Sequence, residues 1–168
     1  RDLAKKLELE GKGLVLDQFS NEANYMAHFN GTGPEIWQQT NGEVTHFVSA
    51  MGTTGTITGV SMFLKSKNKN IKIIGVQPDN DSRIPGIRRW SSEYVPKIRE
   101  NAIIDDIIDI KQSDAEETSE ILSKKYGLFC GLSASANIYI SKELAKTENN
   151  AKIVTIVCDR GDRYISKL

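Results

Sequence analysis

The feature that most constrains the fold is an alternation of short apolar, β-branched runs with stretches of helical spacing. Four such runs are expected to be strands, at 44–50, 71–76, 103–110 and 153–158. Between the first two, residues 56–65 read as a helix with one apolar stripe, formed by Ile57, Val60, Phe63 and Leu64. Strands that alternate with helices predict an α/β fold, a three-layer αβα sandwich around a mostly parallel sheet.

The remaining segments are interpreted from the residues that typically begin and end helices and strands. A short strand is expected at 14–16, and 78–101 is expected to be irregular because it holds three of the four prolines. Ser113 and Glu116 have the spacing of a capping box at the start of a helix. Helices are predicted at 1–10, from 21 with a restart into 34–40, at 113–126, and at 135–146.

Charge and composition exclude several classes of partner. The 168 residues, enough for about one domain, include 22 basic and 22 acidic side chains, so the net charge is zero. Such a balance gives no general attraction to nucleic acid or to an anionic membrane. No stretch approaches the roughly 18 apolar residues that span a bilayer, and the first residues form no signal peptide. We therefore expect a cytoplasmic protein with neither kind of partner.

The cysteines and histidines do not suggest a metal site. Cys130 and Cys158 are too few for a disulfide framework and match no zinc spacing, so we interpret both as buried, reduced thiols. His28 is expected on a helical surface and His46 within a strand, both with structural roles.

Three polar, glycine-bearing turns each follow a strand-like run, at 52–56, 131–135 and 158–164. Ligands of parallel sheets bind at the carboxyl ends of the strands, so these turns are expected to meet at one edge. The first, GTTGT, stands between a strand and a helix, where backbone N–H groups and the helix dipole favour anions. It lacks the P-loop lysine and the dinucleotide fingerprint, which leaves a monophosphate site or a plain turn.

Five motifs together resemble one family. The stretches FVSAMGTTGTITGV, TGPEIWQQT, IPGIRRW, FCGLS and CDRGDRYIS occur in the order and spacing of the pyridoxal-phosphate-dependent cysteine synthases, and most resemble the cysteine synthase B (O-acetylserine sulfhydrylase B) branch. The resemblance runs over nearly the whole chain. It implies the fold-type II, tryptophan synthase β-like architecture, with residues 1–168 as a C-terminal cofactor-binding domain and the family's N-terminal part absent.

The resemblance also implies roles for individual residues. The family's phosphate loop matches Gly52, Thr53, Thr54, Gly55 and Thr56, which would hold the 5′-phosphate of pyridoxal phosphate. Ser133 matches the serine placed against the pyridine nitrogen, although Ala134 and Ser135 stand where the family has serine and glycine. On the substrate side the matching residues are Gly86, Arg88, Cys158 and Asp159, with Arg88 expected opposite Asp159 and Arg160 paired within its loop.

The implied reaction is β-replacement, in which O-acetylserine and sulfide give cysteine, or thiosulfate gives S-sulfocysteine. The lysine that carries the cofactor in the family has no counterpart motif here, so no catalytic residue is assigned and the chain itself is expected to be inactive. The implied parent protein is a homodimer. Two alternatives stay open: a related fold-type II lyase, such as cystathionine β-synthase or serine/threonine dehydratase, and a non-catalytic module that binds another phosphate ligand.

Overall fold

The computed structural model describes residues 2–167, with side chains for residues 2–164. Its helices and strands are α1 (Asp2–Leu9), α2 (Glu22–Ala27), the π-helix η1 (His28–Thr32), α3 (Gly33–Gln39), β1 (His46–Ala50), α4 (Gly55–Lys67), β2 (Lys72–Pro78), the 3-10 helices η2 (Ser92–Tyr94) and η3 (Lys97–Asn101), β3 (Asp106–Ile110), α5 (Gln112–Tyr126), α6 (Leu132–Thr147), β4 (Ile153–Thr155) and the 3-10 helix η4 (Gly161–Lys167). No helix in this range is long and apolar enough to cross a bilayer.

The four strands form one parallel sheet in the order β3-β2-β1-β4. Val48 in the middle of β1 aligns with Ile74 of β2 on one side and with Thr155 of β4 on the other. The chain steps outward from β1 to β3, then crosses back to lay β4 on the opposite side of β1. The direction of winding therefore reverses between β1 and β4, which is where open α/β sheets bind ligands.

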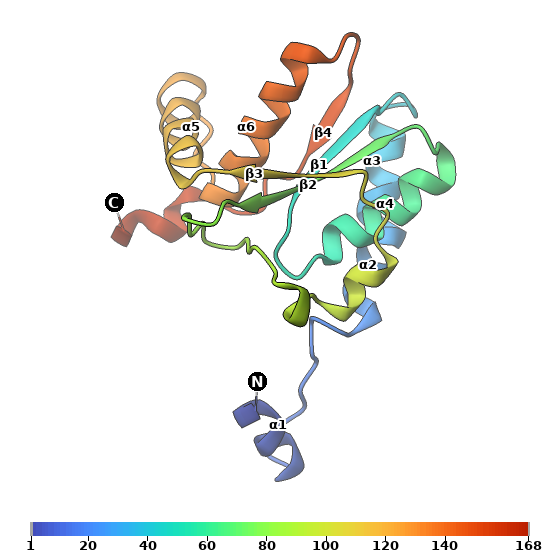
Figure 1. Ribbon diagram of the computed structural model, residues 1–168, viewed down its shortest axis with the longest axis vertical. Coiled ribbons are helices and arrows are strands. Elements are labelled where there is room, and N and C mark those ends of the chain that lie inside the picture. Colours follow the sequence, from blue (N-terminus) through green and yellow to red (C-terminus); the bar gives the residue numbers. More distant parts are fainter. Residues whose placement is uncertain (1, 168) are drawn as a thin grey trace.

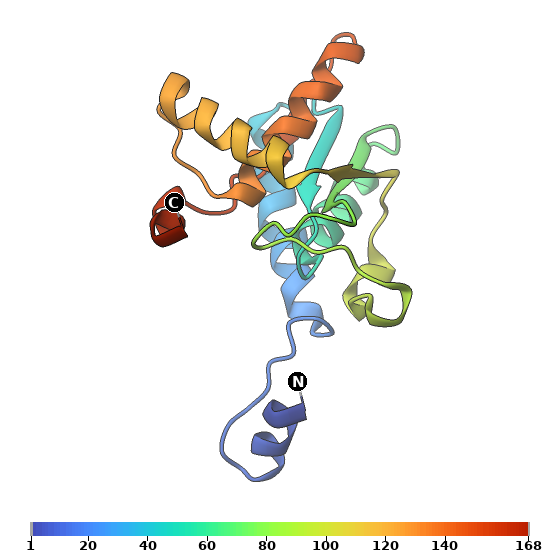
Figure 2. The same ribbon diagram turned by 60° about the vertical axis from the view of Figure 1, so that its left-hand side comes forward.

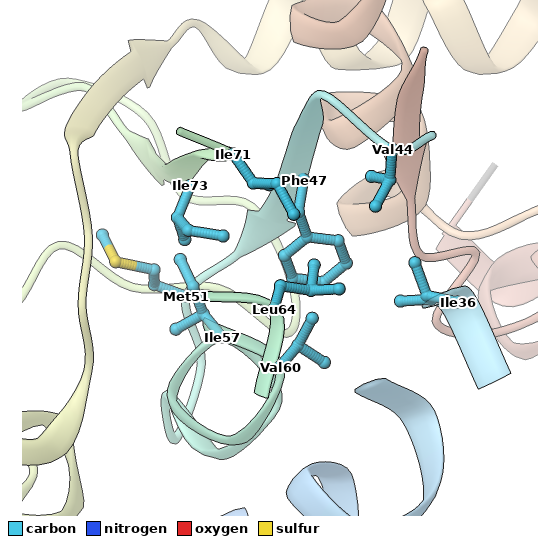
Figure 3. Close-up of a cluster of buried hydrophobic side chains, with 9 residues drawn as sticks. All are labelled: Ile36, Val44, Phe47, Met51, Ile57, Val60, Leu64, Ile71 and Ile73. Atoms are coloured by element: carbon cyan, nitrogen blue, oxygen red, sulfur yellow. The ribbon is translucent and has the colours of Figure 1, made fainter. Parts of the chain in front are cut away.

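Both faces of the sheet are covered by helices, as Figure 1 shows, with α5 and α6 on one side and α2, α3 and α4 on the other. Phe47 and Val48 are neighbours in β1 and point to opposite faces because side chains alternate along a strand. Phe47 packs against Val60 and Leu64 of α4 (Figure 3). Val48 packs in a second cluster with Ile140 of α6. Each such side chain contributes about 1.5–3 kcal/mol by its burial, and the predicted three-layer α/β sandwich is confirmed.

The second helix predicted at 34–40 is confirmed as α3, but no break in helical backbone precedes it. Helical backbone continues from α2 through the π-helix into α3, with Thr32 at φ −56°. Gly33 serves close packing instead of a turn, because a Cβ there would lie 2.7 Å from the Cβ of Phe63 on α4. A π-helix holds one more residue per turn than an α-helix, and such segments often occur at functional sites.

The predicted capping box is wrong, since α5 starts at Gln112 and contains Ser113. The first N–H of the helix is satisfied from far along the chain: Ser82 Oγ accepts a hydrogen bond from Gln112 N at 2.8 Å. Helix α6 begins at Leu132, three residues before the predicted start, after Gly131 as N-cap.

The last strand is shorter than predicted. It ends at Thr155, and Ile156 O accepts a hydrogen bond from Asn137 Nδ2 of α6 at 2.9 Å. The predicted strand at 14–16 is absent among the described residues; Leu14 and Leu16 are 78% and 70% exposed. Residues 2–16 extend from the body of the molecule in both views (Figures 1 and 2), and α1 buries none of its side chains.

Candidate functional site

The site lies at the carboxyl ends of β1 and β4, the two strands between which the winding reverses. The glycine turn leaves β1 there, and the segment to Cys158 and Asp159 leaves β4. Gly86 lies against the turn, because its carbonyl oxygen is 2.6 Å from the position that a Cβ would take on Gly52. A Cβ built on Gly86 would lie 3.6 Å from Ser133 Oγ. The structure thus brings together Gly52, Gly86 and Ser133, which are far apart in sequence.

Thr54 gives the glycine turn its unusual geometry. It precedes the first residue of α4 in the left-handed conformation, with φ +73°. A β-branched residue held there costs about 1–3 kcal/mol, and such strain is concentrated at binding sites. Its Oγ1 is buried and has no hydrogen-bond partner among the described residues. An orphaned hydroxyl at the positive end of a 13-residue helix indicates a place for a polar, anionic group.

The glycines of this turn are required by their neighbours. At Gly55 a Cβ would come within 1.9 Å of Asn24 Oδ1, just as a Cβ at Gly52 would meet the Gly86 carbonyl. The backbone is consequently packed tightly from behind. The N–H groups of the first turn lack intrahelical partners, and that of Gly55 donates to Thr53 Oγ1 at 3.3 Å. This arrangement suits the close approach of a small anion to the backbone.

The segment 86–90 is fastened to the glycine turn. Arg88 N donates to Met51 O at 3.0 Å, and Trp90 Nε1 donates to Gly52 O at 2.9 Å. The Trp90 ring contacts the Phe19 ring edge-to-face and lies under the Arg88 guanidinium, 5.5 Å from its centroid. No ion pair between Arg88 and Asp159 occurs among the described residues, so their predicted opposition stays a prediction. A cavity of about 840 Å³ opens alongside, within residues 78–91.

Ser133 lies in the first turn of α6 and is buried. Both cysteines were predicted to be buried. This is confirmed for Cys130 and wrong for Cys158, which is exposed to solvent. The Cys158 thiol nevertheless lies 3.9 Å from Asn137 Nδ2. Loss of water around this thiol raises its pKa, and a hydrogen bond with Ser133 acts in the opposite direction. Ser133 therefore has a thiol on one side and Gly86 on the other.

Asp159 joins the C-terminal segment to the start of α6. Its backbone oxygen accepts a hydrogen bond from Gly131 N at 3.0 Å, and its Oδ2 accepts one from the Tyr164 hydroxyl at 2.6 Å. That bond, with burial, raises the pKa of Tyr164 to about 12. Oδ1 of Asp159 is buried without a partner among the described residues. The predicted pairing of Arg160 within this loop is confirmed, at 3.1 Å from Asp162.

The two departures from the family pattern are accommodated inside the fold. Ala134 packs against Leu122 and Cys130, and Ser135 Oγ donates to Gly131 O at 3.2 Å. Both residues are fully buried. Their side chains fill the core beneath the helix start.

Sequence reasoning missed two residues of this site, Asn24 and His28. Asn24 Nδ2 lies 3.2 Å from Thr53 Oγ1, and His28 Nε2 lies 3.2 Å from Thr56 Oγ1. The only signal in the sequence is their separation of four residues, which puts them on one helix face. His28 is half-buried beside the turn and not on a free surface, whereas His46 is buried in β1 beside Thr45, as a structural residue would be.

The comparison with protein families decides the class. A model described as pyridoxal-phosphate-dependent enzyme matches residues 1–159. The chain belongs to this family. Cysteine synthase B of Pseudomonas aeruginosa is 52% identical over 166 residues, which cover 99% of this chain and 56% of the relative. The resemblance to cysteine synthase B is thereby confirmed.

Two solved structures share the fold. Cysteine synthase from Entamoeba histolytica has a TM-score of 0.83 at 38% identity and matches 98% of this chain and 52% of its own. O-acetylserine-dependent cystathionine beta-synthase from Helicobacter pylori has a TM-score of 0.87 at 30% identity, over 99% of this chain and 57% of its own. The chain thus spans about half the length of the proteins it matches.

The residues present fit the phosphate end of the family's cofactor. A phosphate monoester needs several donors at short range, and the turn offers backbone N–H groups, three threonine hydroxyls and glycines without side chains. The buried, unpartnered Thr54 Oγ1 adds a polar atom that such a group would satisfy. No group of three or more metal-binding side chains occurs among the described residues.

Proposed function

We propose that the chain is the cofactor-binding part of a cysteine synthase that replaces the acetate of O-acetylserine with a sulfur nucleophile. The observation that carries this proposal is the strained glycine turn at the start of α4, with its buried, unpartnered hydroxyl. The 52% identity to a cysteine synthase B supports the reaction. Sulfide would give cysteine, and thiosulfate would give S-sulfocysteine.

Residues Gly52 to Thr56 would hold the phosphate of pyridoxal phosphate through neutral donors. Ser133 would place its hydroxyl against the pyridine nitrogen, where a neutral partner does not keep that nitrogen protonated. When bound, the cofactor supplies an electron sink for reactions at the amino acid's α- and β-carbons. A hydroxyl in place of a carboxylate suits elimination and replacement better than reactions that need a fully charged ring.

The substrate would be received by the fastened segment and the end of β4. Gly86, at φ +88°, exposes backbone to the substrate's amino group, and Asp159 carries a buried carboxylate oxygen without a partner among the described residues. Arg88 is exposed beside the cavity, where its charge would favour an anionic sulfur donor such as thiosulfate. Cys158 completes this polar side.

Turnover would need groups beyond these 168 residues, since the family's cofactor-bearing lysine has no matching motif in the chain. We therefore expect the chain alone to bind the cofactor without catalysis. The active protein would be a cytoplasmic homodimer.

A titration of the 168-residue chain with pyridoxal phosphate, followed by tryptophan fluorescence, tests the proposal. Saturable binding is expected, with pyridoxal, which lacks the phosphate, binding at least about tenfold more weakly because it forfeits charge-assisted hydrogen bonds. Equal affinity for the two compounds would contradict the assignment of the turn.

The alternative of a non-catalytic phosphate module is separated by Ser133→Ala. If the chain is part of a cysteine synthase, this change should perturb the absorbance of bound pyridoxal phosphate and leave the affinity for inorganic phosphate unchanged. A module without a ring site would show no spectral change. The related-lyase alternative is tested in a full-length relative of this chain, where homocysteine, the sulfur substrate of cystathionine formation, should be a poorer acceptor than sulfide.

A further inference from the structure

The helix that runs from α2 into the π-helix η1 packs closely behind the glycine turn. Gly59 in α4 makes this contact possible, because a Cβ there would lie 2.1 Å from Tyr25 O and 2.7 Å from Phe29 N. Backbone therefore meets backbone at this point. The approach brings Asn24 and His28, four residues apart, under two hydroxyls of the turn.

The orientation of the Asn24 amide is fixed by its partners. Nδ2 lies 2.7 Å from Gln18 O, an atom that can only accept, so the NH₂ group must face that carbonyl. The second hydrogen of the same NH₂ group is then available for Thr53 Oγ1 at 3.2 Å. Since Asn24 donates this bond, the hydrogen of the Thr53 hydroxyl is left for another acceptor.

His28 stands between two threonines. Nδ1 lies 2.9 Å from Thr32 Oγ1, and Nε2 lies 3.2 Å from Thr56 Oγ1. Burial lowers the pKa of His28, so the ring is neutral at pH 7, with one nitrogen donating and the other accepting. If the Thr32 hydroxyl donates to Nδ1, then Nε2–H donates to Thr56 and leaves that hydroxyl's hydrogen for another acceptor as well.

A phosphate dianion accepts hydrogen bonds and donates none. Each threonine hydroxyl has a single hydrogen. A hydroxyl that donates this hydrogen to another acceptor can present only a lone pair to the anion, which repels it. We propose that Asn24 and His28 are positioning residues that donate to Thr53 and Thr56 and thereby commit both hydroxyls as donors to the cofactor's phosphate. This inference rests on the proposed function and adds to it the residues that set the direction of the hydrogen bonds.

The Asn24 arm of the proposal is tested with Asn24→Asp, which keeps the size of the side chain and replaces the donor with an acceptor. The Thr53 hydroxyl would then donate to the new carboxylate, so the affinity of the 168-residue chain for inorganic phosphate should fall about tenfold or more. In a Thr53→Val background the same substitution should have at most half of this effect, because the hydroxyl is gone and only the repulsion between the new negative charge and the phosphate remains.

The His28 arm uses His28→Gln and His28→Leu. The Gln variant retains an N–H donor and should keep most of the affinity for phosphate. The Leu variant should bind phosphate about tenfold more weakly, and this loss should occur only in a chain that retains Thr56. Asn21→Ala is the matched control. Asn21 caps α2 through Ala23 N at 3.0 Å and makes no hydrogen bond to the turn among the described residues, so the change weakens the helix without altering the hydroxyls.

The outcomes distinguish the positioning role of Asn24 and His28 from the phosphate site itself. If Asn24→Asp lowers phosphate affinity equally in the presence of Thr53 and in the Thr53→Val background, or if Asn21→Ala does the same damage, the positioning role is overturned while the phosphate site stands. If the unmodified chain binds neither inorganic phosphate nor pyridoxal phosphate, the proposed function fails and this inference fails with it.

Discussion

The starts of α4 and α6 are two solutions to the same problem, a polar helix terminus at the carboxyl edge of a parallel sheet. The start of α4 presents a strained turn of glycines and threonines, held from behind by Asn24, Gly86 and Trp90. The start of α6 carries two buried hydroxyls, Ser133 and Ser135, of which Ser135 donates to Gly131 O, and Asp159 ties the C-terminal segment to it. In the proposed function the first terminus would receive a charged phosphate and the second would make a single neutral hydrogen bond.

The difference lies in what each glycine meets. A Cβ on Gly52 would strike the backbone oxygen of Gly86, which cannot move without its loop. A Cβ on Gly131 would strike Asp159 Oδ1 at 2.0 Å and the Tyr164 ring at 2.8 Å, which are side chains at the C-terminal edge. The first terminus is therefore rigid by backbone packing, and the second depends on side chains that can turn away.

The largest predicted effect tests the difference in rigidity between the starts of α4 and α6. Gly52→Ala should lower the free energy of unfolding by about 2 kcal/mol, in the range of overpacked cores, and should abolish phosphate binding. Gly131→Ala should cost less than half as much, because Asp159 and Tyr164 can rotate. Urea unfolding of both variants measures the difference, and equal losses would remove the distinction.

A smaller effect is expected from Trp90→Phe. The ring keeps its contact with Phe19, but Gly52 O loses the hydrogen bond from Nε1, at a cost of about 1 kcal/mol in the free energy of unfolding. Phosphate affinity should fall along with it, because Gly52 opens the turn. The other tryptophan is the control: Trp37→Phe should leave phosphate affinity unchanged.

The start of α6 should respond to alkaline pH, because Asp159 there accepts a hydrogen bond from the Tyr164 hydroxyl. The pKa of Tyr164 is raised to about 12, against an ordinary value of about 10. A raised pKa favours the protonated form in the folded state, so this contact stabilises fully below about pH 10 and is lost as the pH rises through about 12. Tyrosinate absorbance should include a tyrosine that titrates near 12, and Asp159→Asn should return it toward about 10 while the raised pKa of Tyr139 stays as it is. A titration near 12 that survives Asp159→Asn would contradict this cause.

The smallest effect should come from the ion pair of the same segment. The Arg160 and Asp162 side chains are 82% and 45% exposed. Arg160→Ala should consequently change the free energy of unfolding by less than about 0.5 kcal/mol. A larger loss in urea unfolding would show that charge, and not the Tyr164 contact and backbone bonds, holds the segment.

The sequence was sufficient to predict the layers because they follow from local pattern. Alternating runs indicated the strands, and the stripe of Ile57, Val60 and Leu64 indicated the buried face of α4. The glycine turn between β1 and α4 was also predicted from the sequence, although its residues alone left a monophosphate site and a plain turn both open.

What escaped prediction depends on partners distant in sequence. Ser82 replaces the expected capping box of α5 across 30 residues, and His28 reaches Thr56 across 28. Gly33 was predicted as part of a helix restart. Its actual role, close packing against Phe63 of α4, depends on a residue 30 positions away that local sequence does not reveal. Local propensity carries no information about such contacts. The residues that pack behind the glycine turn could therefore be identified only from the structure.

The glycine turn itself, Met51 to Thr56, contains no ionisable side chain. A turn of this kind carries no cation that would repel its neighbours or need a counter-ion while the chain folds. The turn can therefore reach its final conformation before any anion arrives, because it contains no charge that must first be neutralised.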